Sequence, residues 1–164
     1  MKIRIIGCSG SGKSYLARGL SQKLGIEAYD LDDIQWDNTQ NTYGIKMPKE
    51  KRAALLAEIL AKESWIIEGV YHSWVQDSFT DADVIYLIEM PKRLYKARII
   101  RRFIRRKLGI EKGKKESLGS LLALLKWTDK FMSENMKEID ELLTPLADKV
   151  VRLKKKKEVM AILK

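Results

Sequence analysis

The stretch GCSGSGKS at residues 7–14 has residue types and spacing that could do chemistry. It matches the Walker A pattern G-x-x-x-x-G-K-[ST] at every fixed position, between an apolar run and a helical pattern. Glycines let successive backbone N–H groups turn toward phosphate oxygens. Lys13 is therefore predicted to reach the β- and γ-phosphates of a nucleotide and Ser14 to bind Mg²⁺, although a glycine turn without a ligand is the alternative. The predicted nucleotide-binding residues of this loop are Gly7, Ser9, Gly10, Ser11, Gly12, Lys13, Ser14 and Tyr15.

Carboxylates follow the second apolar run, in the segment YDLDDIQW at residues 29–36. Ligands of an open α/β sheet bind beyond the carboxyl ends of its strands, so these side chains are predicted to face the phosphates and an acceptor. Asp32 is the preferred candidate to hold the acceptor or to position Mg²⁺ through water, ahead of Asp30 and Asp33. The alternative is that these aspartates cap the helix or turn that follows.

A second acidic position follows the third apolar run, in WIIEGVYHSW at residues 65–74. Glu68 is predicted to hold metal-bound water or to orient the acceptor, and Gly69 to leave room for a ligand near the backbone. Tyr71 and His72 are candidates to line the acceptor pocket. The alternatives are a solvated glutamate and a histidine with a structural role only.

A basic helix is predicted after Pro91, and one of its faces is rich in arginine. At about 100° per residue, four arginines fall in one sector and four apolar residues lie on the other side. Arginine clamps phosphate and neutralises charge on a transferring phosphoryl group, while a solvated basic face, DNA binding and anionic lipid are alternatives. The four arginines are Arg98, Arg101, Arg102 and Arg105, and the four apolar residues are Ile100, Phe103, Ile104 and Leu108.

Alternating strands and helices must position these groups. Short β-branched runs predict strands, whereas leucine, isoleucine and methionine at three- and four-residue steps predict helices. This alternation indicates an α/β fold with a five-stranded parallel sheet covered by helices on both faces. Strands are predicted at 2–6, 26–32, 64–71, 81–90 and 148–153, and helices at 13–25, 48–63, 92–108, 117–143 and 156–164. The 117–143 helix is predicted to face the core through Leu118, Leu121, Leu122, Leu125, Met132, Met136, Ile139 and Leu143.

Composition narrows the class of protein. A length of 164 residues favours one domain, and no apolar run approaches the roughly 20 residues that span a bilayer. The N-terminus does not resemble a signal peptide, so a cytoplasmic location is expected. One cysteine and one histidine exclude an internal disulfide and a structural zinc site, and Cys8 is either a small spacer or a thiol of lowered pKa. The net charge of +10 calls for an anionic partner.

The sequence resembles the small P-loop kinases of the nucleoside and nucleotide kinase type, relatives of adenylate kinase and shikimate kinase. It is most similar to the bacterial DNA topology modulation proteins of the FlaR type, also described as adenylate kinase-related. The resemblance covers most of the chain. It rests on IIGCSGSGKSYLARGL, YDLDDIQW, WIIEGVYHSW, DVIYLIEMPKRLYKARIIRR and VVRLKKKKEVMAIL.

The resemblance implies a three-layer P-loop NTPase fold with a helical lid. Asp32 matches the aspartate and Trp36 the tryptophan of the family's acceptor segment, and Glu68 with Gly69 matches its acid–glycine pair. Val70 stands where asparagine is usual, and residues 108–127 lack the proline- and arginine-rich connection of the family. A lid over residues 92–116, with the four arginines above, and a base-proximal stretch RLKKKKE follow from the same resemblance.

The function predicted from these features is an ATP- or GTP-dependent, Mg²⁺-using phosphotransferase that acts on an unidentified small acceptor. An alternative is a nucleotide-binding regulator of DNA topology that contacts DNA through the basic helix, and another is an inactive P-loop domain. No membrane partner is expected. The predicted catalytic residues are Lys13, Asp32, Glu68, Arg98 and Arg102. Further nucleotide-binding residues are Arg101 and Arg105, acceptor-binding residues are Asp32, Trp36, Gly69, Tyr71 and His72, and metal ligands are Ser14 and Glu68.

Overall fold

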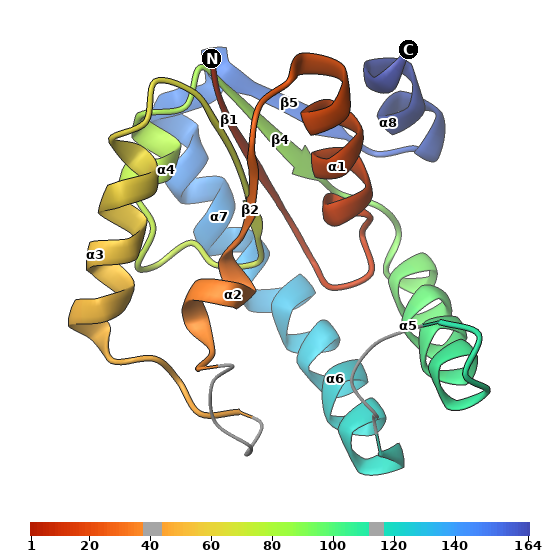
Figure 1. Cartoon of the computed structure of the whole chain (residues 1–164). Helices are drawn as coiled ribbons and strands as arrows, with labels where there is room; N and C mark the ends of the chain where they lie inside the picture. Colours follow the sequence, from red (N-terminus) through yellow and green to blue (C-terminus); the bar gives the residue numbers. More distant parts are fainter. Residues whose placement is uncertain (38–43, 112–116) are drawn as a thin grey trace.

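A computed structural model describes residues 1–37, 44–111 and 117–164 of the chain (Figure 1). Five parallel strands form one sheet in the order β2-β3-β1-β4-β5, which confirms the predicted α/β fold. The strands are β1 (Lys2–Gly7), β2 (Ala28–Asp30), β3 (Trp65–Gly69), β4 (Val84–Ile88) and β5 (Val150–Leu153). No helix among the described residues is long and apolar enough to cross a membrane.

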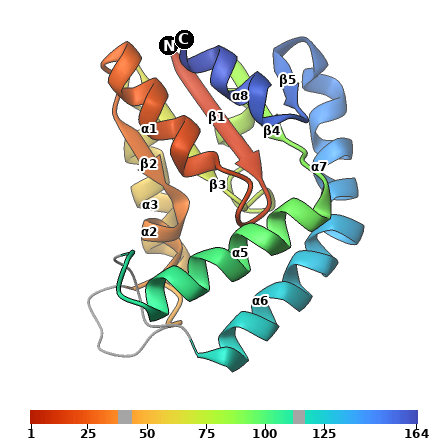
Figure 2. The ribbon, with the colours of Figure 1, turned by 90° about the vertical axis from the view of Figure 1, so that its right-hand side faces the viewer.

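Helices cover both faces of the sheet, as the three-layer prediction requires. The helices α1 (Lys13–Leu24) and α8 (Lys156–Leu163) lie on one face, and α3 (Lys49–Leu60), α4 (Asp77–Thr80) and α7 (Met136–Leu143) lie on the other (Figures 1 and 2). The central strand β1 is therefore buried on both sides, and Ile3, Ile5 and Ile6 are fully inaccessible to solvent. Isoleucines suit this position because neither side of the strand meets water, and Arg4, which lies between Ile3 and Ile5, is also fully buried.

The second strand is shorter than predicted. Strand β2 ends at Asp30, and Leu31–Gln35 forms the short helix α2 instead of continuing the strand to residue 32. The carboxylate of Asp30 accepts a hydrogen bond from the backbone N–H of Asp32 at 2.9 Å, which caps this helix. The capping alternative is thus correct for Asp30, and Asp32 lies in the first turn of a helix.

The helices α5 (Lys92–Lys107) and α6 (Leu118–Lys130) lie side by side beyond the carboxyl ends of the strands (Figure 2). Helix α5 is the predicted basic helix, and it buries Tyr95, Ile99 and Phe103. The predicted apolar side of this helix is only partly correct, because α5 packs along one narrow stripe. Ile100, Ile104 and Leu108 are exposed. Residues 112–116 of the predicted lid lie outside the described residues.

The long helix predicted over 117–143 is present, with one change of helical type. Helix α6 continues through a π-helical turn at Phe131–Asn135 into α7, and a short 3-10 segment, Thr144–Lys149, leads to β5. Its core-facing prediction is wrong at Leu118 and Leu122, which are 61% and 67% exposed. That end of α6 extends past the sheet and packs on α5, which leaves Leu118 and Leu122 on an exposed side of the helix.

Candidate functional site

The loop between β1 and α1 has the backbone shape that the glycine pattern predicts. Gly10 and Gly12 have φ angles of 75° and 102°, a conformation that residues with a side chain rarely adopt. The loop ends where α1 begins at Lys13, so the positive end of the helix dipole faces the space above it. The Ser11 hydroxyl is buried and has no hydrogen-bond partner among the described residues. A bound phosphate oxygen is the partner that such a loop is built to receive.

Lys13 lies almost entirely beneath this loop. Its side chain is 8% exposed, and its ammonium group donates a hydrogen bond to the carbonyl oxygen of Cys8 at 3.1 Å. Burial lowers the pKa of Lys13, and the nearby charge of Glu68 opposes that shift. A buried cation with one neutral acceptor is stabilised by an incoming anion. Lys13 is therefore well placed to bind the phosphates of a nucleotide.

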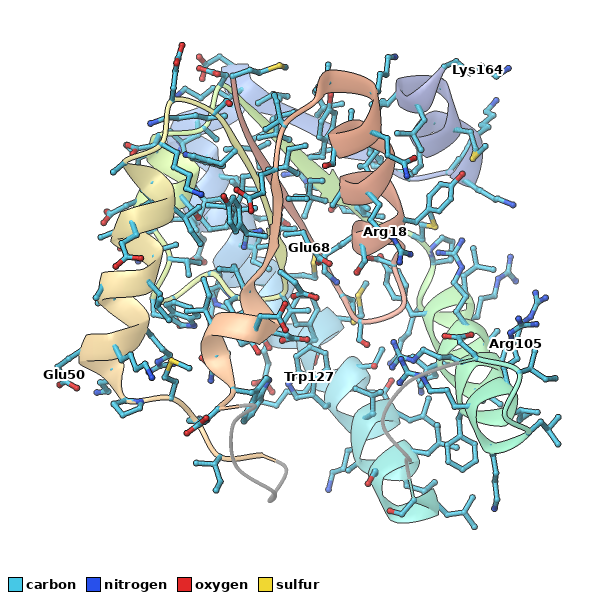
Figure 3. The ribbon with its side chains drawn as sticks, viewed as in Figure 1. Arg18, Glu50, Glu68, Arg105, Trp127 and Lys164 are labelled. Carbon is cyan, nitrogen blue, oxygen red and sulfur yellow. The ribbon has the colours of Figure 1, made fainter. Side chains whose placement is uncertain are left out.

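Glu68 joins the phosphate loop to the end of β3. It is 4% exposed, and the Ser14 hydroxyl donates a hydrogen bond to its Oε1 atom. Figure 3 shows Glu68 near the centre of the molecule. Hydroxyl and carboxylate oxygens suit Mg²⁺, which keeps several waters and usually takes one or two carboxylates together with substrate phosphates. The pair therefore fits a magnesium ion shared with a nucleotide.

Asp32 is held by Tyr71, which comes from the loop after β3. The Tyr71 hydroxyl donates to Asp32 Oδ1 at 2.6 Å, and the Tyr71 carbonyl accepts a hydrogen bond from Arg4 at 2.8 Å. Arg4 is fully buried in β1 and lies over the ring of Phe79. Its burial lowers its pKa to about 9, which leaves the guanidinium protonated at neutral pH. This chain of contacts positions Asp32 from the central strand.

The predicted acceptor residues are only partly brought together. Asp32, Trp36 and Gly69 line one cleft. Tyr71 does not line it, but its hydroxyl group donates a hydrogen bond to Asp32. His72 lies away from the cleft, and its Nε2 atom is 2.6 Å from a carboxylate oxygen of Glu138 on α7. The structure thus places His72 in a contact between the β3 loop and α7, which corresponds to the structural alternative.

The arginine face of α5 is rotated relative to the prediction. Arg98 donates to the carbonyl oxygens of Gly10 and Ser11 at 3.1 and 2.8 Å, which fastens α5 to the phosphate loop. Arg98, Arg102 and Arg106 line the cleft in successive turns. Arg101 and Arg105 do not line it.

Arg105 lies on the outer part of α5 and pairs with Glu111 at 3.3 Å (Figure 3). Arg101 is exposed. The predicted nucleotide-binding roles of these two arginines have no support from their positions, whereas Arg106, which the sequence interpretation omitted, faces the cleft.

The cleft has a volume of about 1770 Å³ and contains most of the predicted loop. Ser9 to Tyr15 line it, whereas Gly7 lies beneath the loop, where an added Cβ would come 2.8 Å from the carbonyl oxygen of Ile88. Tyr15 is half exposed and contacts Met160 of α8 through its hydroxyl. Lining residues that sequence reasoning missed are Arg18, Asp37, Arg106, Trp127 and Met160, whereas Lys156 belongs to the stretch RLKKKKE, which the resemblance placed near the base. Arg18 follows Ser14 by four residues on α1, a spacing that could have identified it.

Cys8 does not have the lowered pKa considered for it. The residue is fully buried, and burial raises the pKa of its thiol despite the nearby charge of Lys13. The thiolate is therefore disfavoured, and the interpretation of Cys8 as a small spacer in the loop fits the structure.

Asp30 gives the site a measurable pH dependence. Burial, followed by the charge of Glu68, raises its pKa to about 7. Its usual value is 3.8, so between these values the folded protein binds more protons than the unfolded chain, and stability falls as pH rises from 4 toward 7. Asp30→Asn keeps an oxygen for the α2 cap and removes the charge.

Asp30→Asn should therefore raise the thermal unfolding midpoint at pH 8 and have progressively less effect toward pH 4. Asp77→Asn, on the exposed first turn of α4, is the matched control and should show no such trend. A difference between Asp30→Asn and wild type that is constant across this range would contradict the assignment.

Comparisons with known proteins agree with this geometry. Residues 3–119 match the family described as AAA domain. A curated relative, the uncharacterized protein YqaC of Bacillus subtilis, is 28% identical over 104 residues. That match covers 63% of this chain and 57% of the relative, so the chain spans little more than half of the relative's length.

Solved structures with a similar fold include two kinases. A gluconokinase from Sinorhizobium meliloti has a TM-score of 0.58 at 15% identity, covering 99% of this chain and 86% of its own. A shikimate kinase from Acinetobacter baumannii, in complex with shikimate, has a TM-score of 0.57 at 17% identity, covering 99% and 90%. At this identity the likeness shows the fold, which is that of the P-loop kinases.

Proposed function

The chain belongs to the AAA domain family, and from this premise we propose that it is an ATP- or GTP-dependent phosphotransferase that acts on a small acceptor. The observation that carries the proposal is the hydrogen bond between Ser14 and Glu68 beside the buried ammonium group of Lys13. This contact brings together the phosphate loop, a hydroxyl group that could bind Mg²⁺ and a carboxylate near the end of β3. Asp32 lies along the same cleft, on the side where an acceptor would enter.

The loop amides and Lys13 would bind the β- and γ-phosphates, and Arg102 and Arg106 would face the phosphates from α5. Ser14 and Glu68 would hold Mg²⁺, which supplies further neutralisation of phosphate charge. Asp32, oriented by Tyr71, would accept the proton of the acceptor hydroxyl. That hydroxyl oxygen then bonds to the γ-phosphorus, and the bond from this phosphorus to the bridging oxygen breaks to release the nucleoside diphosphate.

The nucleotide base would lie toward the β5–α8 connection. Tyr15, Lys156, Val159 and Met160 line the cleft there, next to Arg18. This end corresponds to the lysine-rich stretch predicted to lie near the base. Arg98 is already bonded to the phosphate loop, so we assign it a role in positioning that loop rather than direct contact with the transferring group.

Several narrower expectations belong to the same proposal. The chain would act as a single domain in which α5 and the segment after it serve as a lid over the phosphates. It would work in the cytoplasm. The resemblance to the FlaR-type topology modulation proteins stays a prediction, and an effect on DNA topology would be indirect.

The proposal is tested by nucleoside diphosphate release from purified protein with ATP or GTP across a library of acceptors, with and without Mg²⁺. We expect release that depends on both the acceptor and Mg²⁺. Nucleotide binding with no transfer to any acceptor would instead identify an inactive P-loop domain. Binding to short DNA that falls steeply with the logarithm of salt concentration, without acceptor phosphorylation, would support the DNA-binding alternative.

A further inference from the structure

The charged residues that line the cleft are separated by sign. The cationic lining residues belong to α1, α5 and α8, on the side of the phosphate loop. The carboxylates belong to the ends of β2 and β3 and to α2 with the residues after it, on the acceptor side. The cations are Lys13, Arg18, Arg98, Arg102, Arg106 and Lys156. The carboxylates are Asp30, Asp32, Asp33, Asp37 and Glu68.

Among the described lining residues, the acceptor side has no lysine or arginine. Two arginines of neighbouring elements are engaged in other contacts: Arg4 is buried against Phe79 and the β3 loop, and Arg52 lies over Trp74 and donates to Gln35. Residues 38–43, which lie outside the described part, have the sequence NTQNTY and carry no charged side chain. The charge of Lys13, in the phosphate loop, reaches Glu68, Asp32 and Asp30. Among the described lining residues, however, the charged side chains that belong to the acceptor side itself are all carboxylates, so a carboxylate or phosphate on the acceptor would meet like charge there.

The carboxylates are not arranged as a second metal site. Within the described ranges, no group of three or more histidine, cysteine, aspartate or glutamate side chains could hold a metal ion. Their charges nevertheless repel one another, because Asp30 is the registered neighbour of Glu68 in the sheet, and Asp32 and Asp33 follow Asp30 within three residues. A positive group on the ligand would relieve this repulsion.

Two tryptophans also line the cleft. Trp36 follows α2, and Trp127 reaches the cleft from α6, where its ring packs on Phe131 at a centroid distance of 5.1 Å (Figure 3). Tryptophan faces attract ammonium groups, most strongly where water is excluded. A cleft lined by both carboxylates and tryptophan rings suits an organic cation.

We propose that the acceptor is a hydroxyl compound that carries an ammonium group, of the amino alcohol or amino sugar class. This inference rests on the proposed phosphotransferase function. The ammonium group would bind at Asp33 and the tryptophans, while Asp32 faces the hydroxyl group that is phosphorylated. The chemical step is unchanged: the hydroxyl proton passes to Asp32, and the new oxygen–phosphorus bond replaces the bond to the nucleoside diphosphate.

The test uses acceptors matched in size and differing in charge: glucosamine, glucose and gluconate, and ethanolamine, ethylene glycol and glycolate. ADP release measures transfer, and quenching of tryptophan fluorescence in the presence of Mg²⁺ and a non-hydrolysable ATP analogue measures binding. We expect at least one ammonium compound to exceed its neutral and acidic counterparts by roughly tenfold or more, the size expected for a hydrogen bond to a charged group. If no ammonium compound binds or reacts better than its matched compounds, the inference is overturned.

One variant and its control test whether the ammonium group binds at Asp33. Asp33→Lys should lower kcat/KM for the preferred ammonium compound by roughly tenfold or more, because it replaces an attractive charge by a repulsive one. It should leave the KM for ATP nearly unchanged. Glu50→Gln is the control, because Glu50 is exposed at the outer end of α3, away from the cleft (Figure 3). An equal loss for the ammonium and neutral compounds in Asp33→Lys would contradict a charge-specific role.

Different results would overturn the ammonium inference and the proposed phosphotransferase function. Transfer to a neutral or acidic acceptor that Lys13→Ala abolishes would leave the phosphotransferase function intact and overturn only the ammonium inference. If the wild-type protein binds neither ATP nor GTP, both the phosphotransferase function and the ammonium inference are overturned.

Discussion

Lys13→Ala is expected to reduce kcat/KM for phosphoryl transfer by roughly 100- to 1000-fold, the cost typical of removing one preorganised group that stabilises transition-state charge. Lys13 is 8% exposed, and burial already lowers the pKa of its ammonium group, so a phosphate is the partner that its position favours. Direct titration should also show much weaker binding of ATP and little change in the binding of adenosine, which has no phosphate. ADP release and calorimetric titration provide these two readings.

The control for this variant is Lys51→Ala, on the exposed side of α3 and outside the cleft lining. It removes the same charge from the protein and should leave both readings unchanged. Thermal unfolding of the two variants should be compared first, because Lys13 is buried. A folded Lys13→Ala variant that binds and turns over ATP like wild type would show that the phosphate-loop assignment is wrong.

Glu68→Gln is expected to lower kcat by roughly 100-fold, since it removes a charge that helps to hold the metal at the transferring phosphate. The amide has nearly the same shape and can still accept the hydrogen bond of the Ser14 hydroxyl, so the local fold should survive. The concentration of Mg²⁺ that gives half-maximal ADP release should rise. A Mg²⁺ titration of ADP release, at saturating nucleotide, measures both effects.

Glu58→Gln provides the matched control, because Glu58 is exposed on α3 and does not line the cleft. An unchanged Mg²⁺ dependence in Glu68→Gln, with a lowered kcat, would separate Glu68 from the metal and leave it a role in orienting the acceptor. An unchanged kcat would remove it from the catalytic site.

The phosphate loop could be predicted because its structure is encoded locally. Glycines at positions 10 and 12 allow the left-handed turns, and the strand before them and the helix after them lie within a few residues. Glu68 was predictable for a related reason. The carboxyl ends of parallel strands meet at one edge of the sheet, and Ile5 of β1 is in register with Glu68 of β3.

The rotation of α5 could not be read from its own residues. Placing the residues of α5 about 100° apart around the helix axis groups Arg98, Arg101, Arg102 and Arg105 in one sector. It does not show which part of that sector faces the cleft. Packing determines this: Ile99 and Phe103 contact Leu121 of α6, which turns the stripe of residues 98, 102 and 106 toward the phosphate loop.

Contacts between distant segments were the other features that sequence reasoning missed. His72 pairs with Glu138, 66 residues away, and Trp127 reaches the cleft from a helix beyond the sheet. Asp30 carried a local signal for its cap, since an aspartate two residues before a helical N–H is a common arrangement. Its raised pKa, in contrast, depends on Glu68 and on burial, which only the assembled fold supplies.

The central claim is that this loop binds the phosphates of a nucleotide for transfer. It is tested most directly by a crystal structure with Mg²⁺ and a non-hydrolysable ATP analogue. We predict the β- and γ-phosphates against the amides of residues 10–14, Mg²⁺ near Ser14 and Glu68, and the Lys13 ammonium group moved from the Cys8 carbonyl to a phosphate oxygen. A nucleotide bound elsewhere, with Lys13 still on Cys8, would contradict the account.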